Sequence, residues 1–182
     1  DIIEIPQTDL LPLIRKDPNT AVKVIDRVGT QAVFRPNHLI PPFNNAKARQ
    51  ALLYATGDQK DYLASMIGYA EYEKPCWAVF ICGTPNETLA GVGDWAKGDK
   101  KANVEKAKQL LKEAGYKGEK VVILDPVEAH LAHSQAVVTA QKLREIGMTV
   151  DLQAIDWGTQ SARRQIKDPP EKNPGAWNIF HT

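Results

Sequence analysis

Two histidines three residues apart, His130 and His133, are the first feature of this sequence that could carry chemistry. They fall near the predicted start of a helix, where this spacing places both imidazoles on one face. Imidazole nitrogens are common zinc ligands, but a zinc site needs further protein ligands, and the sequence identifies none for this pair. The pair therefore supports only an alternative hypothesis, a small metal-dependent enzyme domain. We expect no metal and no cofactor.

Polar side chains also follow the predicted strands at their carboxyl ends. Asp125, Val127 and Glu128 come directly after the apolar run Val121–Leu124, and His181 ends the last predicted strand. Ligands of open α/β sheets bind at the carboxyl ends of strands. We therefore predict that these four residues contact a ligand, with ordinary loop surface as the alternative. No nucleophile beside an oriented base, and no carboxylate pair fixed by its spacing, predicts catalysis.

The two cysteines, Cys76 and Cys82, are six positions apart in a stretch rich in apolar residues. In an exported protein this spacing suits a disulfide that closes a small loop, whereas in a cytosolic protein two reduced thiols are expected. The residues alone leave both possibilities open.

The elements that must position these residues follow from the apolar periodicity. A strand over Val121–Leu124, a helix from about Ala129 to Ile146 and a strand over Met148–Ala154 form a strand–helix–strand unit. Sequential strands joined by a helix pair in parallel with a right-handed crossover. A polar loop and a last strand over Ala176–His181 end the chain.

The first half contains a capped helix that follows Pro41-Pro42-Phe43. Its apolar stripe is mostly alanine, so we expect it to lie close against its neighbours, with Asn44 or Asn45 as its cap. Two stretches rich in β-branched residues, Ala21–Val28 and Thr30–Pro36, predict strands upstream. The fold class is therefore α/β, with a mixed sheet of about five strands flanked by helices.

Composition excludes several classes of protein. The chain of 182 residues has 23 basic and 22 acidic residues and a net charge of +1, which does not favour nucleic acid or an anionic membrane as a partner. No apolar run approaches the roughly 18 residues that a membrane span requires. Both ends resemble the interior of a domain, so we expect this sequence to be a piece of a longer protein.

The order of several residues resembles the bacterial extracellular solute-binding proteins of family 5, the receptors of ABC importers. The resemblance rests on Asn37, Pro41-Pro42-Phe43, Arg49-Gln50-Ala51-Leu52 and Tyr54-Ala55, at the offsets found in that family. It continues through the segments Val104–Tyr116 and Gln141–Leu152 and through Asp156-Trp157. Pro75-Cys76 and Cys82-Gly-Thr-Pro85 resemble a subgroup with cysteines here, which implies a disulfide between Cys76 and Cys82.

The resemblance implies a non-enzymatic function and a periplasmic or other extracytoplasmic location. It implies that residues 1–182 form a single lobe, the C-terminal one, of a two-lobed, type II periplasmic-binding-protein-like fold. The other lobe would come from chain before and after these residues. A peptide-like solute would be enclosed between the lobes, contacted here by Asp125–Glu128 and by His181 and Thr182. The expected partners are this solute and ABC permease subunits, and the protein is expected to be a monomer.

Overall fold

A four-stranded mixed sheet is the centre of the computed structural model, which describes residues 1–96 and 98–182. The strand order is β1-β4-β2-β3. β2 runs parallel to both β3 and β4, and β1 pairs antiparallel with β4. The strand bounds are Phe34–Pro36 for β1, Lys120–Pro126 for β2, Thr149–Ile155 for β3 and Ile179–His181 for β4. The mixed sheet and its parallel β2–β3 pair confirm the predicted fold class.

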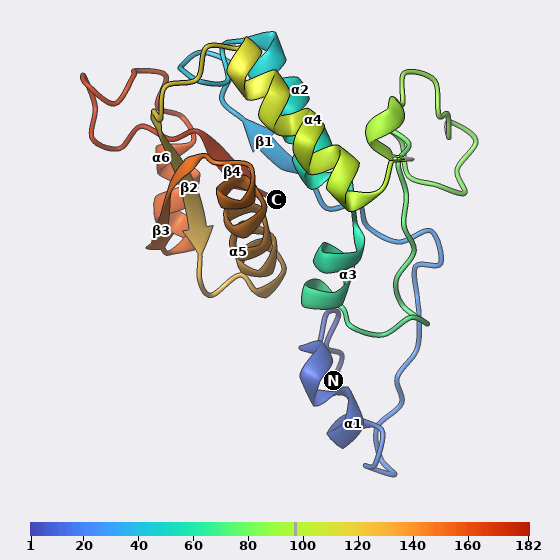
Figure 1. Ribbon diagram of the computed structural model, residues 1–182. Coiled ribbons are helices and arrows are strands. Elements are labelled where there is room, and N and C mark those ends of the chain that lie inside the picture. The colour runs from blue at the N-terminus through green and yellow to red at the C-terminus, as the bar shows by residue number, and fades with distance from the viewer. Residues whose placement is uncertain (97) are drawn as a thin grey trace.

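Helices cover both faces of this sheet, as Figure 1 shows. α2, α4 and α5 lie on one side, with α2 against α4, and α6 lies on the other side. The helices are α1 (Leu11–Ile14), α2 (Ala46–Thr56), α3 (Lys60–Met66), α4 (Lys100–Glu113), α5 (His130–Glu145) and α6 (Trp157–Arg163), with short 3-10 turns at Thr8–Leu10 and Asp94–Ala96. Among the described residues, every helix falls short of the length and apolarity that a membrane span requires.

The apolar core divides at the sheet because neighbouring residues of a strand point to opposite faces. Val121 and Ile123 of β2 face α2, α4 and α5, whereas Val122 and Leu124 face the side of α6. The larger cluster contains Phe43, Ala48, Ala51 and Leu52 and the smaller contains Trp177 and Phe180. β2 is therefore buried on both faces, as its unbroken apolar run predicts.

α2 begins as the sequence predicts. The side chain of Asn45 accepts a hydrogen bond from the backbone N–H of Lys47 at 2.8 Å and caps the helix. Ala48 and Ala51 have no exposed surface, because their small side chains let α2 pack closely in the core. Arg49 reaches back to the carbonyl of Phe43 at 2.7 Å, which fixes the chain before the helix.

Two asparagines join the start of this region to the last strand. Asn178, fully buried just before β4, accepts a hydrogen bond from the N–H of Val122 at 2.8 Å and donates to the carbonyl of Pro41 at 2.9 Å. Asn37 donates to the carbonyl of Trp177 at 3.1 Å, and its N–H donates to the carbonyl of Asn178 at 2.8 Å. These bonds hold β4 in its position between β1 and β2.

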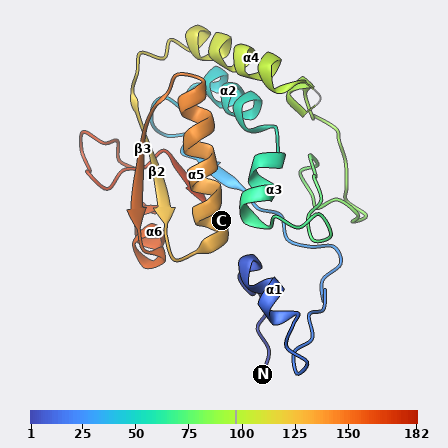
Figure 2. The same ribbon diagram turned by 60° about the horizontal axis from the view of Figure 1, so that its bottom comes forward.

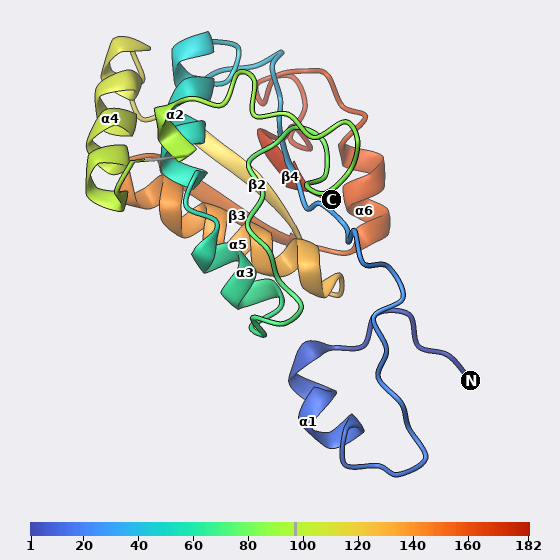
Figure 3. The ribbon, with the colours of Figure 1, turned by 90° about the vertical axis from the view of Figure 1, so that its right-hand side faces the viewer.

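The sheet has four strands and not about five, because most of the predicted strand region before residue 34 is irregular. The stretch Ala21–Val28 has the apolar content of a strand but has no ladder partner, and Ile25 is 83% exposed. A strand depends on its partner for most of its hydrogen bonds, so side-chain composition alone does not form one. Figure 3 shows this segment and α1 extending away from the sheet.

One arginine links this extended segment to the rest of the chain. Arg15 forms an ion pair with Glu71 and donates a hydrogen bond to the hydroxyl of Tyr72 at 2.6 Å. Its guanidinium also lies over the rings of Tyr69 and Tyr72, 5.7 and 5.5 Å from their centroids. Cation–π contacts and an exposed ion pair are each weak, so this link is a modest one.

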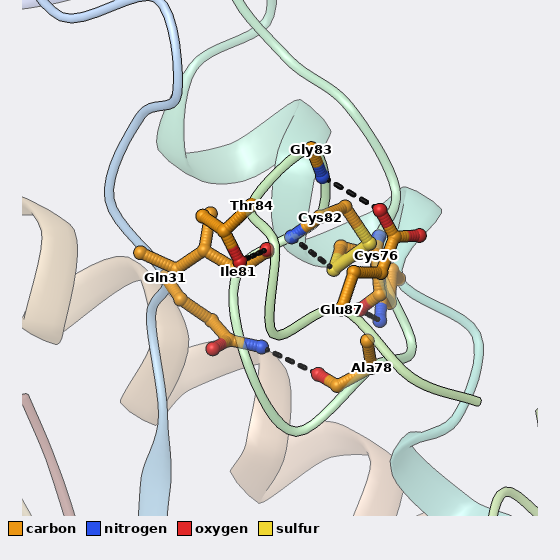
Figure 4. The surroundings of a disulfide bond; sticks show 9 residues. Gln31, Cys76, Ala78, Ile81, Cys82, Gly83, Thr84 and Glu87 are labelled. Atoms are coloured by element: carbon orange, nitrogen blue, oxygen red, sulfur yellow. Dashed lines mark hydrogen bonds between the residues drawn. A yellow bond between two sulfur atoms is a disulfide. The ribbon is translucent and has the colours of Figure 1, made fainter. Parts of the chain in front are cut away.

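The stretch from 69 to 100 contains the disulfide between Cys76 and Cys82 (Figure 4). Lys97, within that stretch, lies outside the described residues. The side chain of Gln59 exchanges two hydrogen bonds with the backbone of Cys76, at 2.6 and 2.8 Å. Gln31 donates to the carbonyl of Ala78 at 3.0 Å from the opposite side of the loop. The disulfide implied by the family resemblance is confirmed, and Gln59 and Gln31 bond the first part of the loop that it closes.

Replacing both cysteines by serine is expected to lower the free energy of unfolding by about 2 kcal/mol, the value that loop-closure entropy gives for so short a loop. Urea unfolding of the double variant and the parent, both without reductant, measures this difference. A parent that loses the same stability in reductant would support it. Equal unfolding midpoints for parent and variant would contradict it.

Candidate binding edge of the sheet

Two parallel strands bring the predicted ligand contacts together at one edge of the sheet. Ile123 of β2 lies opposite Ile179 of β4, so Asp125 and His181, two residues further along each strand, lie level with each other. Both side chains point to the face covered by α5, because a step of two residues preserves the face. We call the region formed by Asp125, Val127, Glu128, His181 and Thr182 the carboxyl edge.

Asp125 is held by a histidine of α5. Its carboxylate, 5% exposed, lies 2.7 Å from Nδ1 of His133. His133 therefore lies at the carboxyl edge, and its own side chain is 39% exposed. From the sequence alone, His133 was a candidate only as one half of a possible metal pair with His130. Within residues 1–96 and 98–182, no group of three or more His, Cys, Asp and Glu side chains could hold a metal ion.

Glu128 and Val127 line the more open part of the edge. The carboxylate of Glu128 accepts a hydrogen bond from the backbone N–H of Trp157, the first residue of α6. Asp156 caps the same helix by accepting from the N–H of Thr159 at 2.8 Å. Val127 donates its N–H to the carbonyl of Ile155 at 3.1 Å, and its side chain is exposed. These bonds fix the backbone but leave both side chains accessible.

His181 is buried completely, which the sequence analysis did not anticipate for a residue expected to touch a ligand. Its Nε2 lies 2.9 Å from the hydroxyl of Thr139 on α5, and that hydroxyl lies 3.0 Å from the hydroxyl of Tyr62 on α3. Figure 2 shows α3 and α5 lying side by side. Burial lowers the pKa of the imidazole from its usual 6.5 to about 3, so the ring is neutral at physiological pH. His181 thus shapes the edge from beneath its surface.

Thr182 follows β4 and is bonded to the residues beside and within β1. Its backbone exchanges two hydrogen bonds with Val33, both 3.1 Å long, and its hydroxyl accepts from Nε of Arg35 at 3.4 Å. Two small hollows of the surface lie elsewhere, one beside Tyr54 and Lys142 and one beside Pro42 and Tyr116. Neither hollow is lined by residues of the carboxyl edge.

Sequence reasoning missed three residues that support this edge, His133 as a partner of Asp125, and Thr139 and Gln160 as partners of His181. One signal was available for Thr139. It is a polar residue between Ala136 and Ala140 on the apolar face of a helix, and a buried hydroxyl needs a hydrogen-bond partner. The identity of that partner depends on tertiary contacts.

A family model for bacterial extracellular solute-binding proteins, family 5 (middle region), matches residues 1–173. A curated relative, the probable peptide ABC transporter periplasmic-binding protein y4tO of Sinorhizobium fredii, is 41% identical over 184 residues. That match covers 100% of this chain and 33% of the relative, so the chain spans about a third of the relative's length.

Solved structures share the same fold. The ABC transporter substrate-binding protein CtaP of Listeria monocytogenes superposes with a TM-score of 0.65 at 24% identity, over 84% of this chain and 31% of its own. The murein tripeptide binding protein MppA of Escherichia coli superposes with a TM-score of 0.63 at 20% identity, over 83% of this chain and 28% of its own. At these identities the likeness concerns the fold.

Proposed function

Because the chain belongs to family 5 of the bacterial extracellular solute-binding proteins, we propose that it is part of the solute-binding component of an ABC importer. The protein would bind its solute outside the cytoplasm and deliver it to the permease subunits without chemical change. A peptide-like solute is favoured by the curated relative, which is named as a peptide transporter component. The metal-enzyme alternative has no support, since His133 bonds Asp125 and the described residues contain no candidate metal group.

Residues 1–182 would form one lobe of a two-lobed receptor, with the rest of the polypeptide supplying the other lobe. The chain's coverage of a third of its curated relative supports this division. Two lobes that close over a solute bury most of its surface and exchange its water for protein hydrogen bonds. A monomer is sufficient for such closure, because both walls of the site would come from one polypeptide.

The observation that carries the site is the parallel register of β2 and β4, which sets Asp125 level with His181. Loops at the carboxyl ends of neighbouring parallel strands form the usual ligand surface of α/β sheets. Glu128 would offer a charge-assisted acceptor to an N–H group of the solute, and Val127 an apolar contact. Thr182 would contribute from the end of β4, with Asp125 and His181 holding the surface in shape.

Substituting Glu128→Gln in the full-length protein is expected to weaken peptide binding about tenfold, as the loss of one charge-assisted hydrogen bond implies. The glutamine keeps an oxygen that can accept from the N–H of Trp157, so the start of α6 is preserved. Calorimetric titration with a mixed library of short peptides, followed by single peptides from the bound fraction, measures the affinity.

The matched control is Glu119→Gln. Glu119 is also an exposed glutamate that accepts a backbone N–H, that of Lys117 at 2.8 Å, but it precedes β2 at the opposite edge of the sheet. It is expected to leave the affinity unchanged. Absence of peptide binding by the parent protein would refute the proposed solute class. Equal losses in both variants would refute the proposed site.

A further inference from the structure

A line of hydroxyl and imidazole groups crosses the interior from α3 to the end of β4. It runs from Tyr62 through Thr139 to His181, with heavy-atom distances of 3.0 and 2.9 Å. Thr139 and His181 have no exposed surface. Nδ1 of His181, which is also buried, has no hydrogen-bond partner among the described residues. A buried polar line of this kind restricts its members to a few arrangements of protons, because an unmade hydrogen bond costs free energy.

Counting donors selects one arrangement. If the Tyr62 hydroxyl donates to Thr139, and Thr139 donates to Nε2 of His181, both hydroxyl protons are used. The neutral imidazole then carries its proton on Nδ1, and that N–H is the one unmet group. In the reverse direction Nε2–H donates to Thr139 and Thr139 donates to Tyr62, which leaves the Tyr62 proton without a partner among the described residues and also leaves the Nδ1 lone pair unmet. The first arrangement therefore has the lower cost.

His181 is held from a second direction as well. Its backbone carbonyl accepts a hydrogen bond from Nε2 of Gln160 on α6 at 3.2 Å, and Gln160 is fully buried. The side chain is thus fixed by α5 and the main chain by α6. β4 is only three residues long, and the next residue, Thr182, belongs to the carboxyl edge. The end of β4 that carries Thr182 is therefore held at His181 by two helices.

We propose that Thr139 and Tyr62 are positioning residues of the carboxyl edge, which hold His181 in the tautomer protonated on Nδ1 and thereby fix the end of β4. The part of this inference that concerns solute affinity rests on the proposed function. The structural part, the tautomer of His181, is independent of the proposed function.

Nitrogen-15 NMR of the full-length protein labelled at histidine tests the tautomer directly, because protonated and unprotonated ring nitrogens resonate far apart. His181 is expected to carry its proton on Nδ1. Thr139→Val removes the donor to Nε2 and is expected to change the His181 pattern, and Thr139→Ser, which keeps the hydroxyl, is expected to restore it. Tyr62→Phe is expected to weaken the preference by removing the first donor of the line.

Solute titration of the same proteins tests the positioning role. The Thr139→Val variant is expected to bind the solute about tenfold more weakly than the parent protein. The Thr139→Ser variant is expected to bind it less than about threefold more weakly. The control is Thr56→Val, which removes another buried hydroxyl, bonded to the carbonyl of Leu52 at 2.7 Å, at the end of α2. It is expected to leave both the His181 signals and the affinity unchanged.

Three results would overturn the proposal: a proton on Nε2 in the parent protein, a His181 pattern unaffected by Thr139→Val, or a changed pattern with unchanged affinity. If the parent protein binds no peptide, the proposed function fails by itself. The NMR pattern then still decides whether Thr139 and Tyr62 set the tautomer.

Discussion

Replacing Phe43 by alanine is expected to lower the free energy of unfolding by about 3–5 kcal/mol, the cost of removing a fully enclosed phenyl ring. Phe43 has no exposed surface and belongs to the larger core cluster with Ala48, Ala51 and Leu52. Its neighbours on α2 are mostly alanines, whose short side chains cannot extend to fill the space. The cavity would therefore persist, and the full penalty would apply.

Phe80→Ala is the matched control, because Phe80 is 53% exposed in the loop closed by the disulfide. Its removal is expected to change stability by less than about 1 kcal/mol. Urea unfolding followed by circular dichroism measures both variants. Equal stability of the Phe43→Ala and Phe80→Ala variants would contradict the packing of α2 against the sheet.

Lowering the pH from 7 to 5 is expected to remove about 2 kcal/mol of stability through His181 alone, and about 4 kcal/mol by pH 3. The pKa of His181 is lowered to about 3 in the folded protein by burial, against an ordinary value of 6.5. Between these values the unfolded chain binds a proton that the folded chain does not. Stability is therefore present above pH 6.5 and is lost progressively as the pH falls towards 3.

Carboxylates contribute to the pH dependence of stability mainly in the lower part of this pH range. The ion pair with Lys142 lowers the pKa of Asp61, and hydrogen bonds lower that of Asp156, so both stabilise the fold above their unfolded values near 4. The interval from pH 7 to 5 therefore lies above the range in which these two carboxylates lose their charge.

His181→Gln is expected to flatten the dependence of unfolding free energy on pH between 7 and 5, and His130→Gln, at an exposed position, to leave it unchanged. Urea midpoints at half-unit steps of pH measure the slope. A slope that survives His181→Gln would show that another group takes up the proton. If His181→Gln does not fold, the slope of Thr139→Val, which retains the buried imidazole, provides the second comparison.

Local patterns in the sequence were sufficient for the elements that contain their own stabilising interactions. α2 begins at Asn45 because an asparagine side chain can cap the helix that directly follows it. The β2–α5–β3 unit follows from an unbroken apolar run, a helical stripe and an alternating stretch. A right-handed crossover then determines that the two strands are parallel. Each of these inferences involves residues close together along the chain.

The strand count and the carboxyl edge required the tertiary structure. The stretch Ala21–Val28 has the composition of a strand but lacks a partner, and composition does not reveal which edges of a sheet are free. Similarly, the sequence places Asp125 and His181 at strand ends but does not bring them level. That depends on the register between β2 and β4, to which Asn178 contributes by bonding Val122, a residue far away in the sequence.

Burial of the candidate residues was also decided by contacts between distant elements. Sequence reasoning identified His181 as a polar residue at a strand end, which predicts an accessible side chain. Its imidazole is buried instead and bonds Thr139 on α5, which in turn bonds Tyr62 on α3, across 42 positions between Thr139 and His181 and 77 between Tyr62 and Thr139. Local sequence specifies which groups need hydrogen-bond partners, but only the packing of α3 and α5 on the sheet determines which partners they receive, because hydrogen bonding is short-ranged in space and not along the chain.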